Sequence, residues 1–211
     1  MIERIPALLD AATEKVRDVP EWANESKGWA ACTFKKKISS AESHLLYWAA
    51  RTLGPGNYAD IGVYRGFSTA CFAHGLQDGL HRGTVYAVDL FEEPSTDPNA
   101  SDNLRTPETL QRYWERFEPN IQLELCVGDS SSWGWSLDVP FKFVFLDADH
   151  SYLGCLRDYE AWERLVVPGG MLAFHDTNFN TVDHVIQEIQ PPWHFLRQIY
   201  STKLFIRMAT K

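Results

Sequence analysis

The sequence predicts an α/β protein built on an open, doubly wound sheet that is mostly parallel. From Gly56 onward, short apolar runs alternate with helical segments, and five such alternations are typical of parallel strands with helices on both faces. The last two apolar runs, 194–200 and 203–208, are separated only by Ser201 and Thr202. Such a short connection indicates a hairpin, so we expect the sheet to end in an antiparallel pair.

The first 55 residues are expected to form a helical cap that precedes the main domain. Apolar residues recur at helical spacing from Ile2 to Val16, and Pro20 stops the pattern. A second helix is predicted over 40–53, with a serine cap and Glu42 near its start and Gly54 at its end. We therefore divide the chain into a cap over 1–55 and a single ligand-binding domain over 56–211.

Local patterns place the remaining elements. Short runs rich in apolar and β-branched residues predict strands at 58–63, 84–90, 121–127, 141–146 and 171–174. Helices are predicted between them at 66–76, 106–118, 152–167 and 181–189. Pro107 falls in the first turn of its helix, where a missing N–H costs little, and the Pro-Gly-Gly run at 168–170 is expected to stop the helix before it.

The composition excludes several classes of protein. A length of 211 residues suffices for one core, and a net charge of −8 argues against a nucleic-acid partner. No apolar run approaches the ~18 residues of a membrane span, and the N-terminus lacks the pattern of a secretory signal. The four cysteines lie far apart with no C-x-x-C pair, which favours reduced thiols in a cytoplasmic protein.

An acidic residue stands at the end of every strand in the alternating run. Ligands of open α/β sheets bind beyond the carboxyl ends of the strands, so these positions are candidate site residues. They are Asp60, Asp89, Asp129, Asp147 with Asp149, and Asp176.

The first strand–helix turn has the pattern D-x-G-x-x-x-G-x-S-T. It lacks the three glycines of a dinucleotide site and the Gly-Lys of a phosphate loop. An acid in this place, Asp60, suits a ligand with an ammonium or sulfonium group. Gly62 and Gly66 would let such a ligand approach the backbone, and Ser68 can donate from the first helical turn. The alternative is a tight turn that needs glycine for its own geometry.

The next two acids suit a nucleoside. Asp89 ends the second strand, where a carboxylate can accept both hydroxyls of a ribose. Asp129 follows the third strand and can accept an adenine amino proton. Each has a structural alternative: Asp89 as a loop or helix-cap acid, and Asp129 as the centre of an Asx turn between Gly128 and Ser130.

These motifs resemble, in order and spacing, those of class I S-adenosylmethionine-dependent methyltransferases. The run 60–69 resembles the first motif and 85–89 the second. The segments 143–152, 158–162 and 168–178 are similar to small-molecule O-methyltransferases, the group of macrolide-sugar, cephamycin-pathway and catechol O-methyltransferase-like proteins. The resemblance covers about residues 39–178. It implies a Rossmann-like, seven-stranded sheet with a reversed C-terminal hairpin strand, and makes 56–211 an S-adenosylmethionine-binding methyltransferase domain.

The resemblance also assigns residues to the cofactor. Glycines and a serine of the first motif would line the methionine part, Asp89 would hold the ribose, and Asp129 with Ser130 would border the adenine. The full set expected at the cofactor is Asp60, Gly62, Tyr64, Gly66, Ser68, Asp89, Leu90, Asp129, Ser130 and Asp147.

A divalent cation is a further expectation. Metal-dependent members of the family bind one through an acid at the position of Asp147 and through residues at 175–176. Asp147 and Asp176 end adjacent predicted strands, so their carboxylates can converge on Mg²⁺ or Mn²⁺, with His175 as a further ligand. His175 stands where several members carry an acid, which favours manganese, zinc or no metal over magnesium. In metal-free members the acid at Asp147 lies near the cofactor's amino group.

His150 and Asp149 are the candidate general bases, with His175 as a third. They follow the fourth strand in a loop facing the substrate, and an imidazole titrates near neutrality. The alternative for His150 is a cap of the following helix. We expect methylation of a hydroxyl on a small molecule, a secondary metabolite or a sugar. The alternative is a cofactor-binding pathway partner that transfers no methyl group. Neither nucleic acid nor a membrane is expected as a partner, and a homo-oligomer stays open.

Overall fold

The computed structural model describes residues 38–64, 66–91 and 107–209. The helix expected over 2–16 lies outside the described residues, so the cap is described only from residue 38. None of the described helices is both long and apolar enough to pass through a bilayer.

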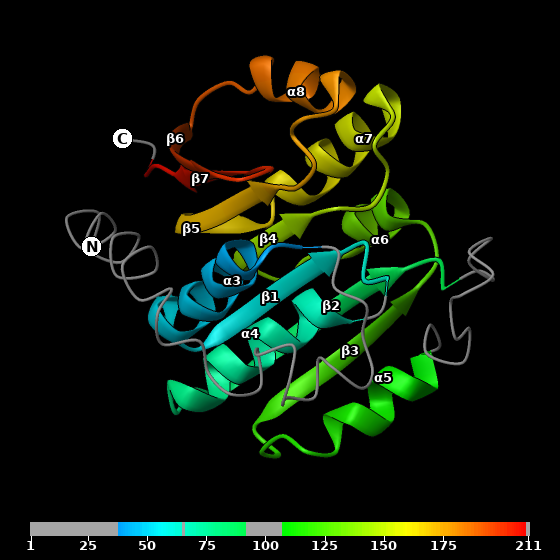
Figure 1. Cartoon of the computed structure of the whole chain (residues 1–211), viewed down its shortest axis with the longest axis vertical. Coiled ribbons are helices and arrows are strands. Elements are labelled where there is room, and N and C mark those ends of the chain that lie inside the picture. The colour runs from blue at the N-terminus through cyan, green and yellow to red at the C-terminus, as the bar shows by residue number, and fades with distance from the viewer. Residues whose placement is uncertain (1–37, 65, 92–106, 210–211) are drawn as a thin grey trace.

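Within these ranges seven strands form one sheet, in the order β3-β2-β1-β4-β5-β7-β6 (Figure 1). The strands are β1 (Gly56–Ile61), β2 (Gly83–Asp89), β3 (Ile121–Val127), β4 (Phe141–Leu146), β5 (Val166–Phe174), β6 (Trp193–Ile199) and β7 (Thr202–Arg207). The first five are parallel, and β7 runs antiparallel between β5 and β6. The predicted Rossmann-like sheet with its reversed hairpin strand is confirmed.

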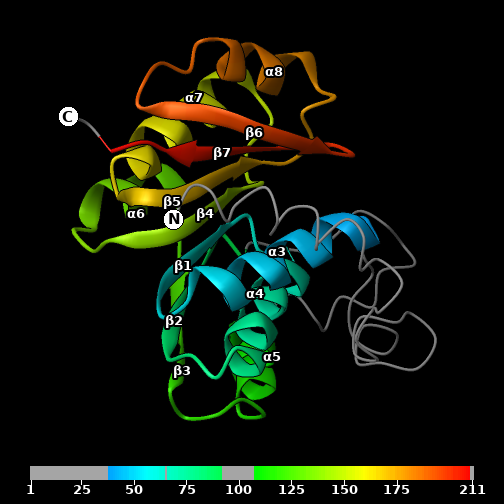
Figure 2. The ribbon, with the colours of Figure 1, turned by 90° about the vertical axis from the view of Figure 1, so that its left-hand side faces the viewer.

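Helices cover both faces of the sheet (Figure 1 and Figure 2). One face carries α3 (Ser40–Leu53), α4 (Phe67–Asp78) and α5 (Pro107–Trp114), and the other carries α6 (Ser130–Ser136), α7 (Tyr152–Glu163) and α8 (Asn180–Gln187). The alternation of a strand assigns its side chains to the two cores: Phe143 and Phe145 of β4 pack on the first face, Val144 and Leu146 on the second. All four are buried, as in a strand covered on both sides.

Helix α3 begins at a capping box. The Ser39 hydroxyl accepts a hydrogen bond from the Glu42 backbone N–H at 3.3 Å, and a Glu42 carboxylate oxygen accepts from the Ser39 N–H at 2.8 Å. The predicted serine cap is therefore confirmed. The helix ends at Gly54, which has a φ of 81°. Its buried side packs against α4 and places Glu42 at the carboxyl-end edge of the sheet, beside the β6–β7 turn.

The largest differences from the prediction are α6, which was not predicted, and the segment after α7, since this helix ends at Glu163 and not at residue 167. Helix α6 has a Ser- and Gly-rich sequence with weak helix propensity, and it forms because Asp129 caps it and α7 packs on it: the Trp162 indole donates to the Ser130 carbonyl at 3.0 Å. Strand β5 starts at Val166 rather than at residue 171. The Pro-Gly-Gly run at 168–170 lies inside it, where the pairing with β4 shifts register between Val166 and Met171, so it interrupts the regular pairing without ending the strand.

Candidate active site

The predicted site residues gather at one end of the sheet, where its parallel strands finish. Asp60 is in β1, Asp89 ends β2, Asp147 directly follows β4, and His175 and Asp176 follow β5. Because β1, β2, β4 and β5 are parallel, their carboxyl ends meet at this end.

The first turn is shaped by glycine. Gly62 has a φ of 94°, and a Cβ there would lie 2.3 Å from the backbone oxygen of Asp147. A side chain at position 62 would therefore separate β1 from the loop after β4. Gly66, with a φ of 80°, begins α4. Because neither glycine has a side chain, a ligand can approach the backbone closely at the point where the resemblance places a cofactor.

Asp60 and Ser68 turn toward each other. Asp60 is completely buried, and one of its carboxylate oxygens accepts from the Ser68 hydroxyl at 2.7 Å and from the Thr69 hydroxyl. Burial raises the pKa of Asp60 to about 7, although these hydroxyl donors oppose the shift. The pair thus ties β1 to the first turn of α4. Direct contact of Asp60 or Ser68 with a cofactor stays a prediction.

Both carboxylate oxygens of Asp89 are held by backbone N–H groups, and its contact with a ribose stays a prediction. One carboxylate oxygen accepts from the Tyr64 backbone N–H and the other from the Phe91 backbone N–H, both at 2.8 Å. Each oxygen of a carboxylate has a second lone pair, so the fixed group can still accept two hydrogen bonds from a diol. The neighbouring Leu90 is 52 % exposed and offers an apolar surface beside it.

Asp129 and Ser130 are engaged within the chain. Asp129 caps α6: one carboxylate oxygen accepts from the Ser132 N–H at 2.7 Å and the Ser131 hydroxyl at 2.8 Å, and these bonds lower its pKa. The Ser130 hydroxyl donates to buried Asp158 at 2.5 Å. Burial raises the pKa of Asp158 to about 6, against the effect of that bond. Asp129 thus acts as a helix cap, where the expected alternative was an Asx turn, and its contact with an adenine stays a prediction.

The predicted metal ligands converge. Donor atoms of Asp147, His175 and Asp176 all lie within 4.8 Å of one another. Nδ1 of His175 is 3.0 Å from Oδ1 of Asp147 and 3.4 Å from Oδ1 of Asp176. Asp176 has a φ of 50°, an uncommon conformation for a residue other than glycine. A set of two carboxylates and one imidazole suits Mn²⁺ or Zn²⁺ better than Mg²⁺, which prefers oxygen alone.

His150 is the fourth member of this cluster. Its Nε2 lies 3.1 Å from Oδ2 of Asp176 and 3.5 Å from Oδ1 of Asp147. Hydrogen bonding to Asp147 raises its pKa, although partial burial opposes the shift. The ring of Phe179, 48 % exposed, lies beside it at a centroid distance of 5.2 Å. Helix α7 is capped by Ser151, so the alternative role of His150 as the cap is wrong.

Asp149 faces another way. One oxygen accepts from the Ser151 N–H at 2.7 Å, and the other lies against Gly154, where an added Cβ would approach it to 2.0 Å. Its carboxylate thus stabilises the start of α7, whereas His150 reaches the cluster. Of these two candidate bases, His150 is the one whose side chain lies beside Asp147 and Asp176.

Glu42 was missed as a site residue. It is buried, and one of its oxygens lies 3.6 Å from Nε2 of His175. Burial raises the pKa of Glu42, but hydrogen bonds from His175, Ser39 and Ser201 outweigh burial and hold it well below its ordinary value. Burial lowers the pKa of His175, but Asp147 and Glu42 outweigh it and raise that pKa to about 10. The sequence signal for Glu42 was the capping box, which explains only one of its two oxygens.

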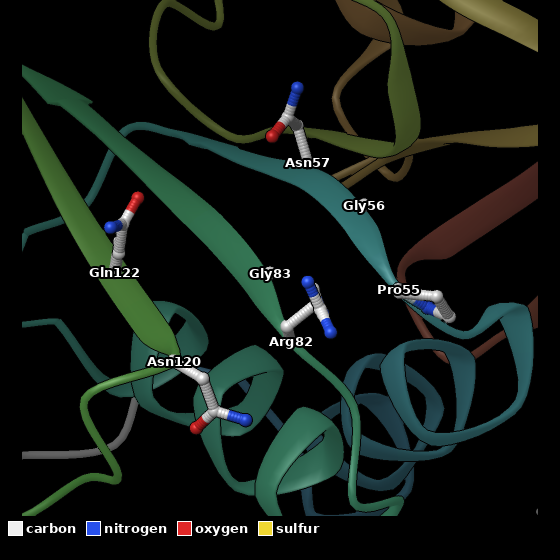
Figure 3. A pocket seen from close by; sticks show the side chains of 7 residues that line it. All are labelled: Pro55, Gly56, Asn57, Arg82, Gly83, Asn120 and Gln122. Atoms are coloured by element: carbon white, nitrogen blue, oxygen red, sulfur yellow. The ribbon is translucent and has the colours of Figure 1, made fainter.

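One of two cavities lies at this cluster, and the larger one lies elsewhere. A cavity of about 10 Å³ lies beneath the cluster, lined by Asp147, His150, Asp158 and His175 among others, and has room for about one water. A hollow of about 570 Å³ lies at the opposite edge, at the starts of β1, β2 and β3 (Figure 3). Its lining carries one charged side chain, Arg82, and no acid or histidine, so its size does not make it the reactive site.

Comparisons with known proteins point to one fold and one family. A family model described as "Methyltransferase domain" matches residues 59–177. The structure of the O-methyltransferase NovP is similar with a TM-score of 0.65 at 14% identity, covering 97% of this chain and 98% of that one. The O-methyltransferase from Bacillus cereus in complex with SAH gives 0.57 at 17% (95% and 91% covered), and CalS11, a TDP-rhamnose 3'-O-methyltransferase of calicheamicin biosynthesis, gives 0.58 at 15% (96% and 93%).

At these identities the solved structures establish the fold alone. The family model spans more than half of the chain and includes every strand end described above except that of the reversed hairpin. The chain therefore belongs to the methyltransferase-domain family and is an S-adenosylmethionine-dependent methyltransferase.

Proposed function

We propose that the protein methylates a hydroxyl oxygen of a small molecule, a secondary metabolite or a sugar, with a divalent cation held by Asp147, His175 and Asp176. These three residues and His150 converge at the carboxyl ends of the parallel strands, and this convergence is the observation that supports the proposal. Two of the similar structures are O-methyltransferases by name, and a third acts on a rhamnose hydroxyl, which is consistent with such an acceptor.

The chain's residues divide the work of the reaction. S-adenosylmethionine supplies, when bound, an electrophilic methyl group on a sulfonium. Asp89 anchors the ribose hydroxyls and so fixes where that methyl lies. His150 takes the proton of the acceptor hydroxyl at Nδ1, the ring nitrogen that does not face the carboxylates, while Asp147 and Asp176 lie beside Nε2–H and stabilise the imidazolium that forms. Most of the rate then comes from holding the acceptor oxygen and the methyl carbon in line.

A cation would act on the acceptor rather than on the cofactor. Asp147, His175 and Asp176 would hold it, and it would supply charge that makes a bound hydroxyl more acidic. Neither the metal nor the acceptor class is established by the family match, so both belong to the proposal.

Methyl transfer from labelled S-adenosylmethionine tests the proposal. The purified protein is incubated with hydroxylated sugars, phenols and polyketide-like alcohols, with Mn²⁺, with Mg²⁺ and with a chelator. We expect label in a methyl ether, identified by mass spectrometry, and loss of transfer on chelation that Mn²⁺ restores. Tight cofactor binding without transfer to any acceptor would instead support the cofactor-binding partner. Transfer unaffected by chelation would overturn the metal assignment alone.

A further inference from the structure

Glu42 is an acid whose burial needs an explanation beyond helix capping. It comes from α3, ahead of the matched methyltransferase model, and its side chain is 3 % exposed. A buried carboxylate is costly unless it is paired and hydrogen-bonded. The capping box uses only Oε2, which accepts from the Ser39 N–H at 2.8 Å.

The other oxygen is the centre of a separate set of contacts. Oε1 accepts from the backbone N–H of Ser201 at 3.1 Å, from the Ser201 hydroxyl at 2.9 Å and from the Thr202 hydroxyl at 2.9 Å. Nε2 of His175 lies 3.6 Å from the same oxygen. All these donors come from the β6–β7 turn and from the end of β5, far from α3 in the sequence.

Ser201 joins Glu42 to the histidine ring. Its hydroxyl donates to Glu42, so its oxygen is available to accept from Nε2–H of His175, 3.3 Å away. The backbone N–H of Thr177 in turn donates to the Ser201 carbonyl at 2.9 Å, which holds the turn beside β5. A relay thus runs from the Nε2 proton through the Ser201 hydroxyl to the Glu42 carboxylate.

The two nitrogens of His175 therefore have different surroundings. Nε2 faces Ser201 and Glu42, and Nδ1 faces Asp147 and Asp176. Without a cation both nitrogens face acceptors. A cation shared with Asp147 and Asp176 would take the place of the proton on Nδ1, whereas the acceptors at Nε2 would keep the other proton there, which is how carboxylates orient metal-binding histidines.

We propose that Glu42 is a positioning residue: through Ser201 it holds the proton on Nε2 of His175, so that Nδ1 presents its lone pair to a divalent cation shared with Asp147 and Asp176. This inference rests on the metal assignment of the proposed function. It makes α3 part of the active site, although Glu42 touches neither substrate nor cation. The imidazole of His175 can replace an acid as a metal ligand because the carboxylate of Glu42, through Ser201, orients it.

Mn²⁺ binding to the full chain without cofactor or acceptor tests the proposal, measured by calorimetry or by the electron paramagnetic resonance of free Mn²⁺. We expect Glu42→Gln, whose amide oxygen can still accept but carries no charge to hold the Nε2 proton, and Ser201→Ala, which removes the link to His175, to weaken Mn²⁺ binding about 10–100-fold, the usual effect of losing an outer partner of a ligand. S-adenosylmethionine affinity should change little. Ser39→Ala is the matched control, because it removes the cap of the same helix and leaves Oε1 and its donors in place.

The outcomes separate this inference from the proposed function. If the wild type binds Mn²⁺ and Glu42→Gln binds it equally well, or if Ser39→Ala weakens binding as much as Glu42→Gln, the positioning role is wrong and the metal assignment stands. If the wild type binds no Mn²⁺, the metal assignment fails and the inference with it.

A second measurement does not depend on whether a variant folds. In ¹⁵N-labelled wild-type protein loaded with diamagnetic Zn²⁺, long-range ¹H–¹⁵N spectra show which ring nitrogen of His175 carries the proton. We expect the proton on Nε2. A proton on Nδ1 would overturn the proposal.

Discussion

His150 and Asp149 are neighbours in one loop but have different partners. His150 reaches Asp147 and Asp176, whereas Asp149 holds the Ser151 N–H and lies against Gly154. At the level of the single residue, the direction of the side chain therefore decides the role: His150 lies at the site, and Asp149 stabilises the start of α7.

A pair of substitutions at these residues tests the assignment of the base. We expect His150→Gln to lower kcat by about 10²–10⁴-fold, the usual contribution of a general base, with cofactor affinity kept. Asp149→Asn can still accept from Ser151, so its kcat should remain within a few-fold of the wild type. Steady-state kinetics with the best acceptor measures both. The opposite order of effects would transfer the role to Asp149.

A comparison of Gly62 with Gly54 distinguishes the cost of a strained backbone from the cost of a steric clash. Gly54 has a similar φ of 81° but nothing within 4 Å of an added Cβ, whereas at Gly62 that atom would meet Asp147 backbone at 2.3 Å. We expect Gly54→Ala to lower the free energy of unfolding by about 1–3 kcal/mol from backbone strain, and Gly62→Ala to lower it further and weaken cofactor binding. Denaturant unfolding and calorimetry measure the two effects. Equal losses would show that the approach of the two loops is unimportant.

The raised pKa of Asp60 predicts how stability changes with pH. The folded state holds this proton more tightly than the unfolded chain, since the pKa rises from 3.8 to about 7. Its contribution is present at pH 4 and is lost as the pH rises to about 7, with a slope of at most about 1.4 kcal/mol per pH unit.

Asp60→Asn should remove that slope, since an amide does not titrate and its oxygen can still accept from Ser68 and Thr69. Unfolding of the cofactor-free protein by urea between pH 4 and 7.5 gives the comparison. Buried Asp158 titrates in the same direction in both proteins, so it cancels in the difference. Parallel stability curves would mean that Asp60 stays charged in the folded state.

At the level of elements, periodicity predicted the strands and most helices because apolar side chains alternate between two buried faces. It failed at α6, whose sequence has little helix propensity and which depends on Asp129 and on packing against α7. It also failed at the start of β5, because a Pro-Gly-Gly run is typical of a stop but lies inside the strand here, at a shift of its register with β4. Glu42 was missed for a related reason: its cap is local, but its other partners lie 159 and 160 positions away.

Helix α6 offers a test that separates capping from ligand contact. We expect Asp129→Ala to lower the free energy of unfolding by about 1 kcal/mol, the typical value for a lost N-cap. Asp129→Asn keeps the cap and should lose little. If Asp129 also contacts the adenine, the Ala variant should bind S-adenosylmethionine more weakly than the loss of stability explains. Equal stability of both variants and the wild type would show that α6 does not need its cap.

On the scale of the whole molecule, several of the 28 acidic residues gather in one place. The described acids Asp60, Asp89, Asp147 and Asp176, with Glu42, all stand at the ligand edge of the sheet. Such an edge attracts a sulfonium or a divalent cation and repels a polyphosphate.

The charge predicts no affinity for nucleic acid. Fluorescence anisotropy with labelled single- and double-stranded RNA at low salt, where phosphate contacts are strongest, should show no binding at micromolar protein. S-adenosylmethionine binding by the same sample serves as the control for folded protein. RNA binding that weakens steeply with added salt would contradict this prediction and would make a nucleic acid a candidate methyl acceptor.

The direction of β7 has a consequence for the backbone itself. A parallel strand would end beside the acids of the ligand edge and would direct the negative end of its small dipole there. Because β7 is reversed, it begins at that edge: Lys203 pairs with Phe174, and the turn before it lies beside His175. A strand that begins there contributes amide hydrogens, and the one at Ser201 is spent on Glu42. The reversed strand thus supplies this edge with hydrogen-bond donors that another parallel strand would have placed on the far side of the sheet.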